Sequence, residues 1–202
     1  MEIETPHGLA RAHVYEPSDA VGALVLGHGA GGGITARDLA TATDVALSLG
    51  TTVVLVEQPY RVAGRRSPAP AAHLDTAWVA TVEHLRADTL GSLPLVVGGR
   101  SSGARVACRT ADRLGAYGVL CLAFPLQPPR RRTGAEPPSR LDELDGVTAP
   151  VLVVQGARDP FGMPPAGESR SVAVVEGDHS LRTDHASIAG AIRAWLPTVL
   201  HR

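Results

Sequence analysis

The chain has 202 residues, of which 44% are hydrophobic, and its formal net charge is −1. This length and composition suit a single globular domain over residues 1–202, and a near-zero net charge argues against a nucleic-acid-binding surface. All 19 cationic residues are arginine. Because lysine is lacking, the sequence excludes Schiff-base enzymes, pyridoxal-phosphate enzymes and P-loop nucleotide-binding proteins.

The sequence also carries signals about location. The segment Met1–Glu4 is not a basic stretch followed by an apolar one, so no signal peptide is expected. No apolar run approaches the roughly 20 residues that a membrane-spanning helix needs. Two cysteines, Cys108 and Cys121, are too few for a disulfide framework. We therefore expect a cytoplasmic protein with no membrane partner, and the sequence indicates no oligomeric state.

Strand patterns recur along the whole chain. The first two segments, Glu2–Thr5 and Ala12–Tyr15, alternate polar and apolar residues, as antiparallel edge strands do. Six later segments are also predicted to be strands, and most of them are apolar on consecutive residues, which is typical of parallel strands buried on both faces. These are Ala23–Leu26, Thr52–Val56, Leu95–Val97, Val119–Ala123, Val151–Val154 and Val172–Val175.

Helical patterns separate these strands. The first follows a possible capping box, Thr35 with Asp38, and ends at Gly50. The other apolar stripes are Leu74, Trp78, Val82 and Leu85; Ala104, Ala107, Cys108, Ala111 and Leu114; and Ile188, Ile192, Trp195, Leu196 and Val199. The alternation predicts a mostly parallel, doubly wound α/β sheet flanked by helices. The proline- and arginine-rich stretch Gln127–Arg140 is expected to be a loop.

A nucleophile motif lies between the predicted strand Leu95–Val97 and the predicted helix that begins near Ala104. The segment Leu95–Gly103 contains G-x-S-x-G as Gly99, Ser101 and Gly103. In a nucleophile elbow, serine occupies a strained turn, and the flanking glycines avoid clashes with the neighbouring strand and helix. The simpler alternative is an ordinary turn in which Ser101 or Ser102 caps the helix.

A serine nucleophile needs a base, and the base needs a carboxylate to hold it. Asp159 and His179 each follow the end of a predicted strand, at the edge where open α/β sheets place their sites. With Ser101 they have the chain order serine, acid, histidine. Asp178 is the competing acid, but adjacent side chains in an extended segment point apart. The histidines expected at the surface or in a helix cap are His73, His84 and His185.

A glycine-rich loop, Leu26–Gly33, follows an early strand. Its H-G pair followed by small residues is typical of an oxyanion loop, in which the backbone N–H of Ala30 would be one donor. The N–H of Ser102, after the nucleophile, would be the other. His28 is expected to hold the loop through hydrogen bonds of its ring.

The motifs H-G-A-G-G, G-R-S-S-G, Q-G-A-R-D-P and G-D-H-S-L together resemble the α/β-hydrolase superfamily, near its small dienelactone-hydrolase-like members. The resemblance covers nearly the whole chain and implies Ser101 as nucleophile, Asp159 as acid and His179 as base. The chain has no long insertion for a lid domain, so only Gln127–Arg140 could partly cover the site. Dienelactone hydrolases use cysteine where this chain has serine. We therefore predict a serine hydrolase for small carboxylic esters or thioesters, with no cofactor or metal.

Two other functions compete with this prediction. Gly27, Gly29 and Gly32 spell G-x-G-x-x-G, and Glu57 ends the next strand, as in an NAD(P)-binding oxidoreductase. Against this, two apparent strands precede the loop, and His28 would occupy the tight pyrophosphate turn. The second alternative is a non-catalytic binding protein on a hydrolase fold, since fold does not fix function. An intact serine–acid–histidine series argues against that alternative.

Arginines near the predicted site are candidate substrate-binding residues. Arg100 precedes the nucleophile, and Arg61, with Arg65 and Arg66, follows a strand at the same edge of the sheet. Guanidinium groups there would favour esters that carry a carboxylate or phosphate. The alternative is that they are solvated loop residues, with Arg100 in a structural ion pair near the helix start.

Overall fold

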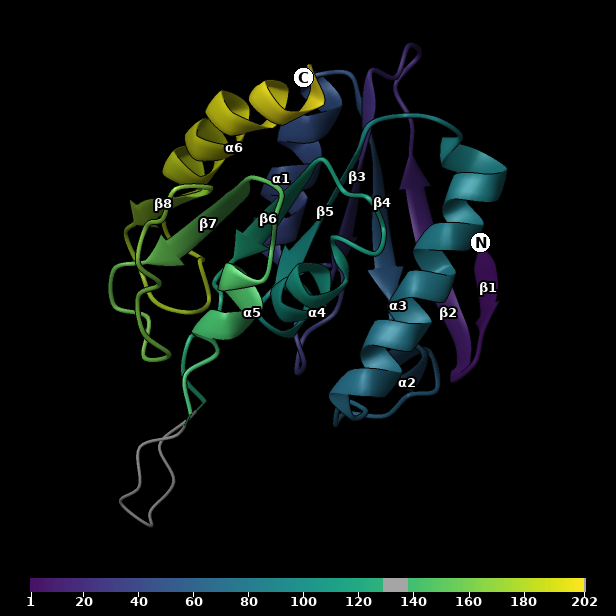
Figure 1. The fold of residues 1–202 in the computed structure, drawn as a ribbon, viewed down its shortest axis with the longest axis horizontal. Helices are drawn as coiled ribbons and strands as arrows, with labels where there is room; N and C mark the ends of the chain where they lie inside the picture. Colours follow the sequence, from purple (N-terminus) through teal and green to yellow (C-terminus); the bar gives the residue numbers. More distant parts are fainter. Residues whose placement is uncertain (129–137, 202) are drawn as a thin grey trace.

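In residues 1–128 and 138–201, which the computed structural model describes, eight strands form one sheet (Figure 1). The strand order is β1-β2-β4-β3-β5-β6-β7-β8. β2 runs antiparallel to both neighbours, and every other neighbouring pair is parallel. The strands are β1 (Glu2–Thr5), β2 (Gly8–Tyr15), β3 (Gly22–Gly27), β4 (Thr51–Glu57), β5 (Leu95–Arg100), β6 (Gly118–Leu122), β7 (Val151–Gly156) and β8 (Arg170–Val175). The predicted α/β sheet with an antiparallel pair at its start is confirmed.

Helices cover both faces of this sheet. In Figure 1, α3 and α4 lie in front of the strands, whereas α1 lies behind them. The helices on the side of α3 and α4 are α2 (Pro59–Val62), α3 (Ala71–Leu85), α4 (Ser102–Thr110) and α5 (Leu141–Asp145). Those packed on the other face are α1 (Arg37–Ser48) and α6 (His185–Leu200). A π-helical turn, Arg86–Leu90, follows α3.

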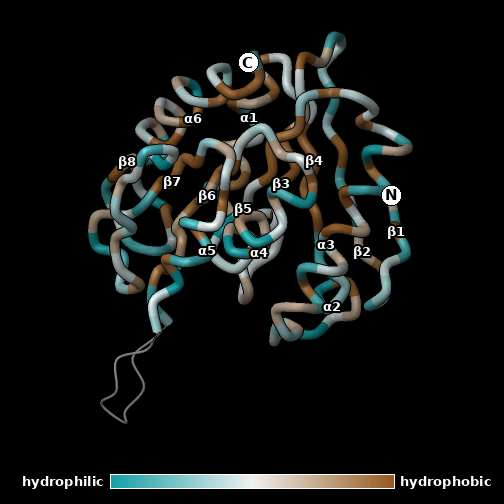
Figure 2. The backbone as a smooth tube through the Cα atoms, in the orientation of Figure 1, coloured by the Kyte–Doolittle hydropathy of each residue, from teal (hydrophilic) through white to brown (hydrophobic). Residues whose placement is uncertain are grey.

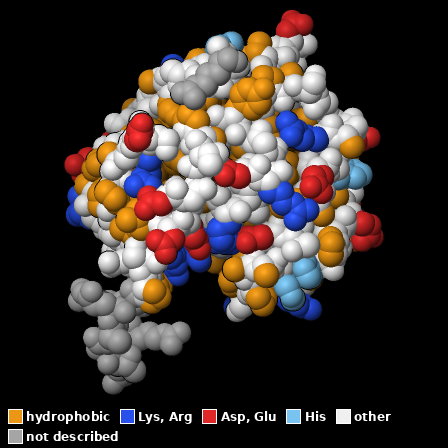
Figure 3. All heavy atoms as spheres, in the orientation of Figure 1, with side chains coloured by type: hydrophobic (Ala, Val, Ile, Leu, Met, Phe, Trp, Pro, Cys, Tyr) orange, Lys and Arg blue, Asp and Glu red, His pale blue; other side chains and the backbone are white. Residues whose placement is uncertain are grey.

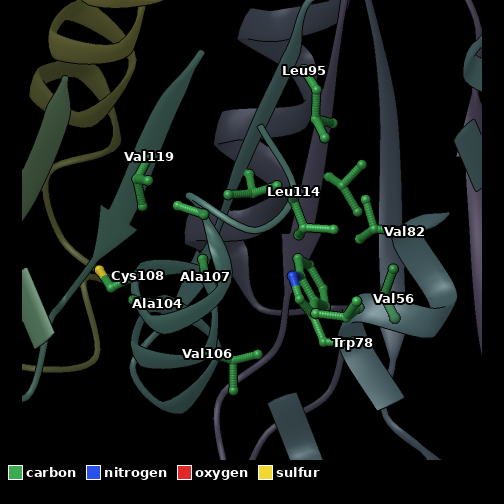
Figure 4. Packing of buried hydrophobic residues seen from close by; sticks show 14 of the residues in the cluster. Val56, Trp78, Val82, Leu95, Ala104, Val106, Ala107, Cys108, Leu114 and Val119 are labelled. Carbon is green, nitrogen blue, oxygen red and sulfur yellow. The ribbon is translucent and has the colours of Figure 1, made fainter. Parts of the chain in front are cut away.

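Each face of the sheet has its own apolar core. Trp78 of α3 is 1% exposed and packs in the cluster that contains Val56, Val82 and Leu95 (Figure 4). On the opposite face, Ile188 and other residues of α6 pack with residues of α1 and of the strands. The central strands are accordingly hydrophobic along their length (Figure 2). Burial on both faces explains why their apolar residues are consecutive and not alternate.

Ion pairs join the helices of the α3–α4 face. Arg109 of α4 contacts Asp75 of α3 at 2.6 Å and Glu143 of α5 at 3.0 Å, and Arg105 contacts Glu143 at 2.6 Å. Acidic and basic side chains are interspersed over this face in Figure 3. The network fixes the position of α4, the helix that begins just after Ser101.

None of the described helices combines the length and apolar character that a bilayer-spanning helix requires.

Two local predictions were wrong. The capping box does not form, because α1 begins after Ala36 without a side-chain cap and the carboxylate of Asp38 is buried beside Arg100 instead. The helix predicted from the stripe Ala104–Leu114 is α4, and it ends earlier, at Thr110, although the turn after it still buries Leu114. The short helices α2 and α5 lie in segments with no predicted helix, because four or five residues are too few to show a helical period.

Candidate active site

Ser101 occupies a sharp turn between β5 and α4. Its backbone has φ 52° and ψ −107°, in the left-handed half of conformational space that residues other than glycine seldom adopt. The backbone N–H of Ser101 donates to the carbonyl of Leu122 in β6 at 2.9 Å, which anchors the turn to the sheet. A strained serine at the end of a buried strand has the geometry of a nucleophile elbow.

The glycines around Ser101 allow a close approach of backbones. A Cβ atom on Gly99 would lie 2.5 Å from the carbonyl oxygen of Gly27 in β3, and one on Gly103 would collide with the same oxygen. Real Cβ atoms do not tolerate such contacts. The predicted reason for glycine on both sides of the serine is therefore confirmed.

Three strand ends bring Ser101, His179 and Asp159 together. The Oγ atom of Ser101 lies 2.9 Å from Nε2 of His179. The other ring nitrogen, Nδ1, lies 2.8 Å from Oδ2 of Asp159. Ser101 follows β5, Asp159 follows β7 and His179 follows β8. The carboxyl ends of these parallel strands lie at one edge of the sheet, and the three expected residues form one hydrogen-bonded row there.

The carboxylate of Asp159 is fully enclosed, with 0% of its side chain exposed. Its Oδ1 accepts from the backbone N–H of Phe161 at 2.9 Å, and its Oδ2 accepts from the side-chain amide of Gln155 at 2.9 Å. The ring of Phe161 also packs against that of His179, with centroids 4.4 Å apart. These contacts leave Asp159 one orientation, toward His179.

Sequence reasoning missed Gln155. Its side chain is 0% exposed, and its amide nitrogen also approaches the carbonyls of Phe124 at 3.0 Å and Gly162 at 2.8 Å. Three acceptors around one amide group fix its orientation. A glutamine at the end of an otherwise apolar strand was the sequence signal that pointed to a buried polar role.

Asp178, the competing acid, turns away from His179. One of its carboxylate oxygens accepts from the backbone N–H of Ser180 at 2.8 Å and from the hydroxyl of the same residue. These hydrogen bonds lower the pKa of Asp178. The prediction that Asp159, and not Asp178, contacts His179 is confirmed.

His28 holds the glycine-rich loop in place. Its Nε2 accepts from the backbone N–H of Gln58 at 3.1 Å, which leaves the proton on Nδ1 to donate to the carbonyl of Gly29 at 2.9 Å. Burial lowers the pKa of His28, which keeps the ring neutral. The hydroxyl of Tyr60 donates to the carbonyl of Ala30 at 3.1 Å. The predicted structural role of His28 is confirmed.

The amides expected to bind an oxyanion lie on either side of Ser101. Ser102 is the first residue of α4, so its backbone N–H has no acceptor within the helix. Ala30 belongs to the loop that passes Ser101, because a Cβ atom on its neighbour Gly29 would lie 3.6 Å from the Cβ of Ser101. Both residues thus lie next to Ser101 or to the loop that contacts it, and their role as oxyanion donors stays a prediction.

The sequence matches the family described as "Alpha/beta hydrolase domain" over residues 20–194. The chain belongs to the α/β-hydrolase family. Membership in this family supports a hydrolase activity and disfavours the NAD(P)-dependent oxidoreductase. In agreement with this, Oε2 of Glu57 in this hydrolase lies 3.1 Å from Nε2 of His13 and 3.7 Å from Nη1 of Arg11. Its carboxylate is therefore already paired.

Solved structures share the fold of this hydrolase. A serine hydrolase without a lid, XC6422 from Xanthomonas campestris, is 19% identical, with a TM-score of 0.75 over 98% of this chain and 93% of that one. Est1E from Butyrivibrio proteoclasticus with bound ferulic acid is 14% identical, with a TM-score of 0.81 over 100% of both chains. A dienelactone hydrolase from Anabaena variabilis is 15% identical, with a TM-score of 0.77 over 98% and 95%. No curated protein sequence matches the chain.

A cavity of about 770 Å³ opens beside Ser101 and His179 of the hydrolase. The glycines Gly31–Gly33 and the N-terminus of α1 form part of its lining. The loop Gln127–Arg140 begins close to Phe161, which packs against His179, since the N–H of Gln127 donates to the carbonyl of Phe161 at 2.8 Å. Residues 129–137 of this loop lie outside the described residues, so its role as a cover remains a prediction from the sequence.

The candidate substrate-binding arginines have different surroundings. Arg100 lines the cavity, but its Nε lies 2.9 Å from Oδ2 of the buried Asp38, and it donates to the carbonyl of His179 at 3.0 Å. Burial raises the pKa of Asp38, and the positive charge of Arg100 opposes that shift. Arg61 lies in α2 and does not line the cavity. The structural ion pair anticipated as the alternative for Arg100 is therefore present.

Within residues 1–128 and 138–201, no group of three or more His, Cys, Asp or Glu side chains is placed to hold a metal ion. Cys108 and Cys121 are buried, with their sulfur atoms 3.5 Å apart and no disulfide bond between them.

Proposed function

We propose that this chain is a serine hydrolase that cleaves small carboxylic esters or thioesters through an acyl-enzyme. One observation carries the proposal: the row of hydrogen bonds from Ser101 through His179 to Asp159, which begins at a serine in strained backbone geometry. A strained turn exposes the serine oxygen to a substrate, and the row supplies the base that its proton needs.

In the first half-reaction, Oγ of Ser101 forms a bond to the carbonyl carbon while its proton moves to Nε2 of His179. The electron pair of the carbonyl moves to its oxygen, which accepts hydrogen bonds from the N–H groups of Ala30 and Ser102. The bond to the leaving oxygen or sulfur then breaks. His179 gives its proton to the departing alcohol or thiol.

In the second half-reaction, water replaces the alcohol. His179 takes a proton from water as its oxygen attacks the acyl carbon, and it returns a proton to Ser101 as the acid leaves. Asp159 stays ionised throughout; it holds the tautomer of His179 that has the proton on Nδ1 and stabilises the imidazolium. Because a chain of this length has little sequence available to build a deep, covered pocket, we expect substrates with small acyl groups.

The test is labelling with a fluorophosphonate probe, followed by mapping of the modified residue by mass spectrometry. We expect the probe on Ser101, loss of labelling and of p-nitrophenyl butyrate hydrolysis in Ser101→Ala, and continued labelling of Ser102→Ala. The alanine at position 102 keeps the backbone N–H that the mechanism uses. Labelling of another residue would overturn the assignment. Absence of both labelling and turnover would favour the non-catalytic binding protein.

A further inference from the structure

Two arginines that sequence reasoning did not single out line the cavity of the candidate site. Arg37 is the first residue of α1, and Arg182 lies between His179 and the start of α6. Both are exposed, and both border the cavity that Ser101 and His179 share. The topology thus brings two guanidinium groups from segments far apart in sequence to the same cavity.

These two arginines differ from Arg100 in their partners. The charge of Arg100 is balanced by the buried carboxylate of Asp38. The ion pairs formed between described residues include neither Arg37 nor Arg182. Two positive charges in the lining therefore have no negative counterpart among the described side chains.

The acidic residues closest in sequence do not neutralise Arg182. The carboxylate of Asp178 accepts from Ser180, and that of Asp184 accepts from the backbone N–H groups of Ser187 and Glu176. Neither aspartate lines the cavity. Both are committed to the turns that lead from β8 into α6.

The position of Arg37 is electrostatically unfavourable for the helix that carries it. The N-terminus of a helix is positive, so an arginine at the first residue adds like charge there. Opposite it, the glycine loop leaves open space, because Cβ atoms on Gly31, Gly32 and Gly33 would meet nothing within 4 Å. The cavity therefore combines free volume, a helix N-terminus and two arginines, an arrangement that attracts an anion.

We infer that the site takes anionic esters: substrates in which a carboxylate or phosphate, separate from the scissile carbonyl, binds Arg37 and Arg182 while the carbonyl lies at Ser101. This inference rests on the proposed function and adds the substrate class. Guanidinium groups recognise both anions by paired hydrogen bonds, and their field also raises the rate of encounter.

The kinetic test compares two esters of one acyl chain, the 4-nitrophenyl ester of glutaric acid, with a free carboxylate, and its methyl-capped neutral counterpart. We expect kcat/KM to favour the anionic ester about tenfold at low salt, and the preference to shrink as salt rises. Arg37→Gln and Arg182→Gln should each remove most of it. Arg193→Gln, an exposed arginine on α6 outside the cavity, is the matched control and should keep it.

A binding measurement separates this inference from the esterase proposal. Ser101→Ala is titrated with monomethyl glutarate, dimethyl glutarate and methyl phosphate and followed by NMR, which needs no turnover. The inference is supported if Ser101→Ala binds the anions and the additional change Arg182→Gln abolishes that binding, even if no ester is hydrolysed. The anion that binds more tightly shows whether the site prefers a carboxylate or a phosphate. Equal kcat/KM for both esters at both salt concentrations, or equal binding of charged and neutral ligands, would overturn it and leave the esterase intact.

Discussion

The side-chain amide of Gln155 donates to the same carboxylate oxygen of Asp159 that lies 2.8 Å from the ring of His179. Because the amide is itself surrounded by the carbonyls of Phe124 and Gly162, it cannot follow Asp159 if that carboxylate rotates. We therefore expect Gln155 to be a positioning residue, which acts on the proposed reaction through Asp159.

Replacing Gln155 by leucine tests this positioning role. The change removes the two N–H donors that three acceptors share, so the free energy of unfolding should fall by about 1–3 kcal/mol. We expect kcat for a p-nitrophenyl ester to fall about tenfold or more with little change in KM. Urea denaturation and steady-state kinetics measure the two effects. An unchanged kcat in a destabilised variant would mean that Gln155 serves the fold alone.

Asp159 and Asp178 provide a matched pair of substitutions. Asp159→Asn should lower kcat by about 10³–10⁴-fold, because an amide at this position favours the wrong tautomer of His179. Asp178→Asn changes an exposed carboxylate that accepts from Ser180 and does not contact His179, so it should retain most of the activity. Kinetics with one neutral ester decide the matter, and the reverse order of effects would reassign the acid.

Gly103 is expected to tolerate no side chain. In Gly103→Ala the new methyl group meets the backbone carbonyls of Gly27 and His28, which cannot move without disturbing β3. We expect a loss of stability of about 1–3 kcal/mol or more and a large drop in activity. Gly31→Ala is the control for stability, since its methyl group would meet nothing within 4 Å. Thermal unfolding should separate the two variants clearly; equal melting temperatures would contradict the close approach of β3 and α4.

His28 should make stability depend on pH. Its pKa in the folded chain is lowered by burial from an ordinary value of 6.5, so below that pH the unfolded chain binds a proton that the folded chain does not. The stability is therefore complete above pH 6.5 and declines as the pH falls from there toward the lowered pKa, by at most about 1.4 kcal/mol per pH unit.

The comparison is with His28→Gln, which carries no titrating group at this position. Urea denaturation of both proteins between pH 7.5 and 5 should show a steeper loss in the wild type. Parallel curves would mean that His28 is protonated equally in the folded and unfolded chains.

The strands and the hydrogen-bonded row of Ser101, His179 and Asp159 could be predicted because their signals are local. Consecutive apolar residues identify the strands of the parallel sheet, and the segments after β5, β7 and β8 carry Ser101, Asp159 and His179. The remaining features depend on contacts between distant segments. Asp38 matched a capping pattern, yet its carboxylate contacts Arg100 from another strand end. Arg37 and Arg182 belong to no motif, and only the folded chain brings them to one cavity.

Arg100 links two parts of the site that come from opposite halves of the chain. Its guanidinium contacts Asp38 at the start of α1 and the carbonyl of His179, while its own backbone leads directly into Ser101. The planar guanidinium of Arg100 therefore helps to hold the segment of Ser101 at a fixed distance from the segment of His179. Lysine, a point charge on a flexible stem, offers no rigid fork to span both contacts. In this chain, exchange of one cation for another beside the serine would change alignment without changing charge.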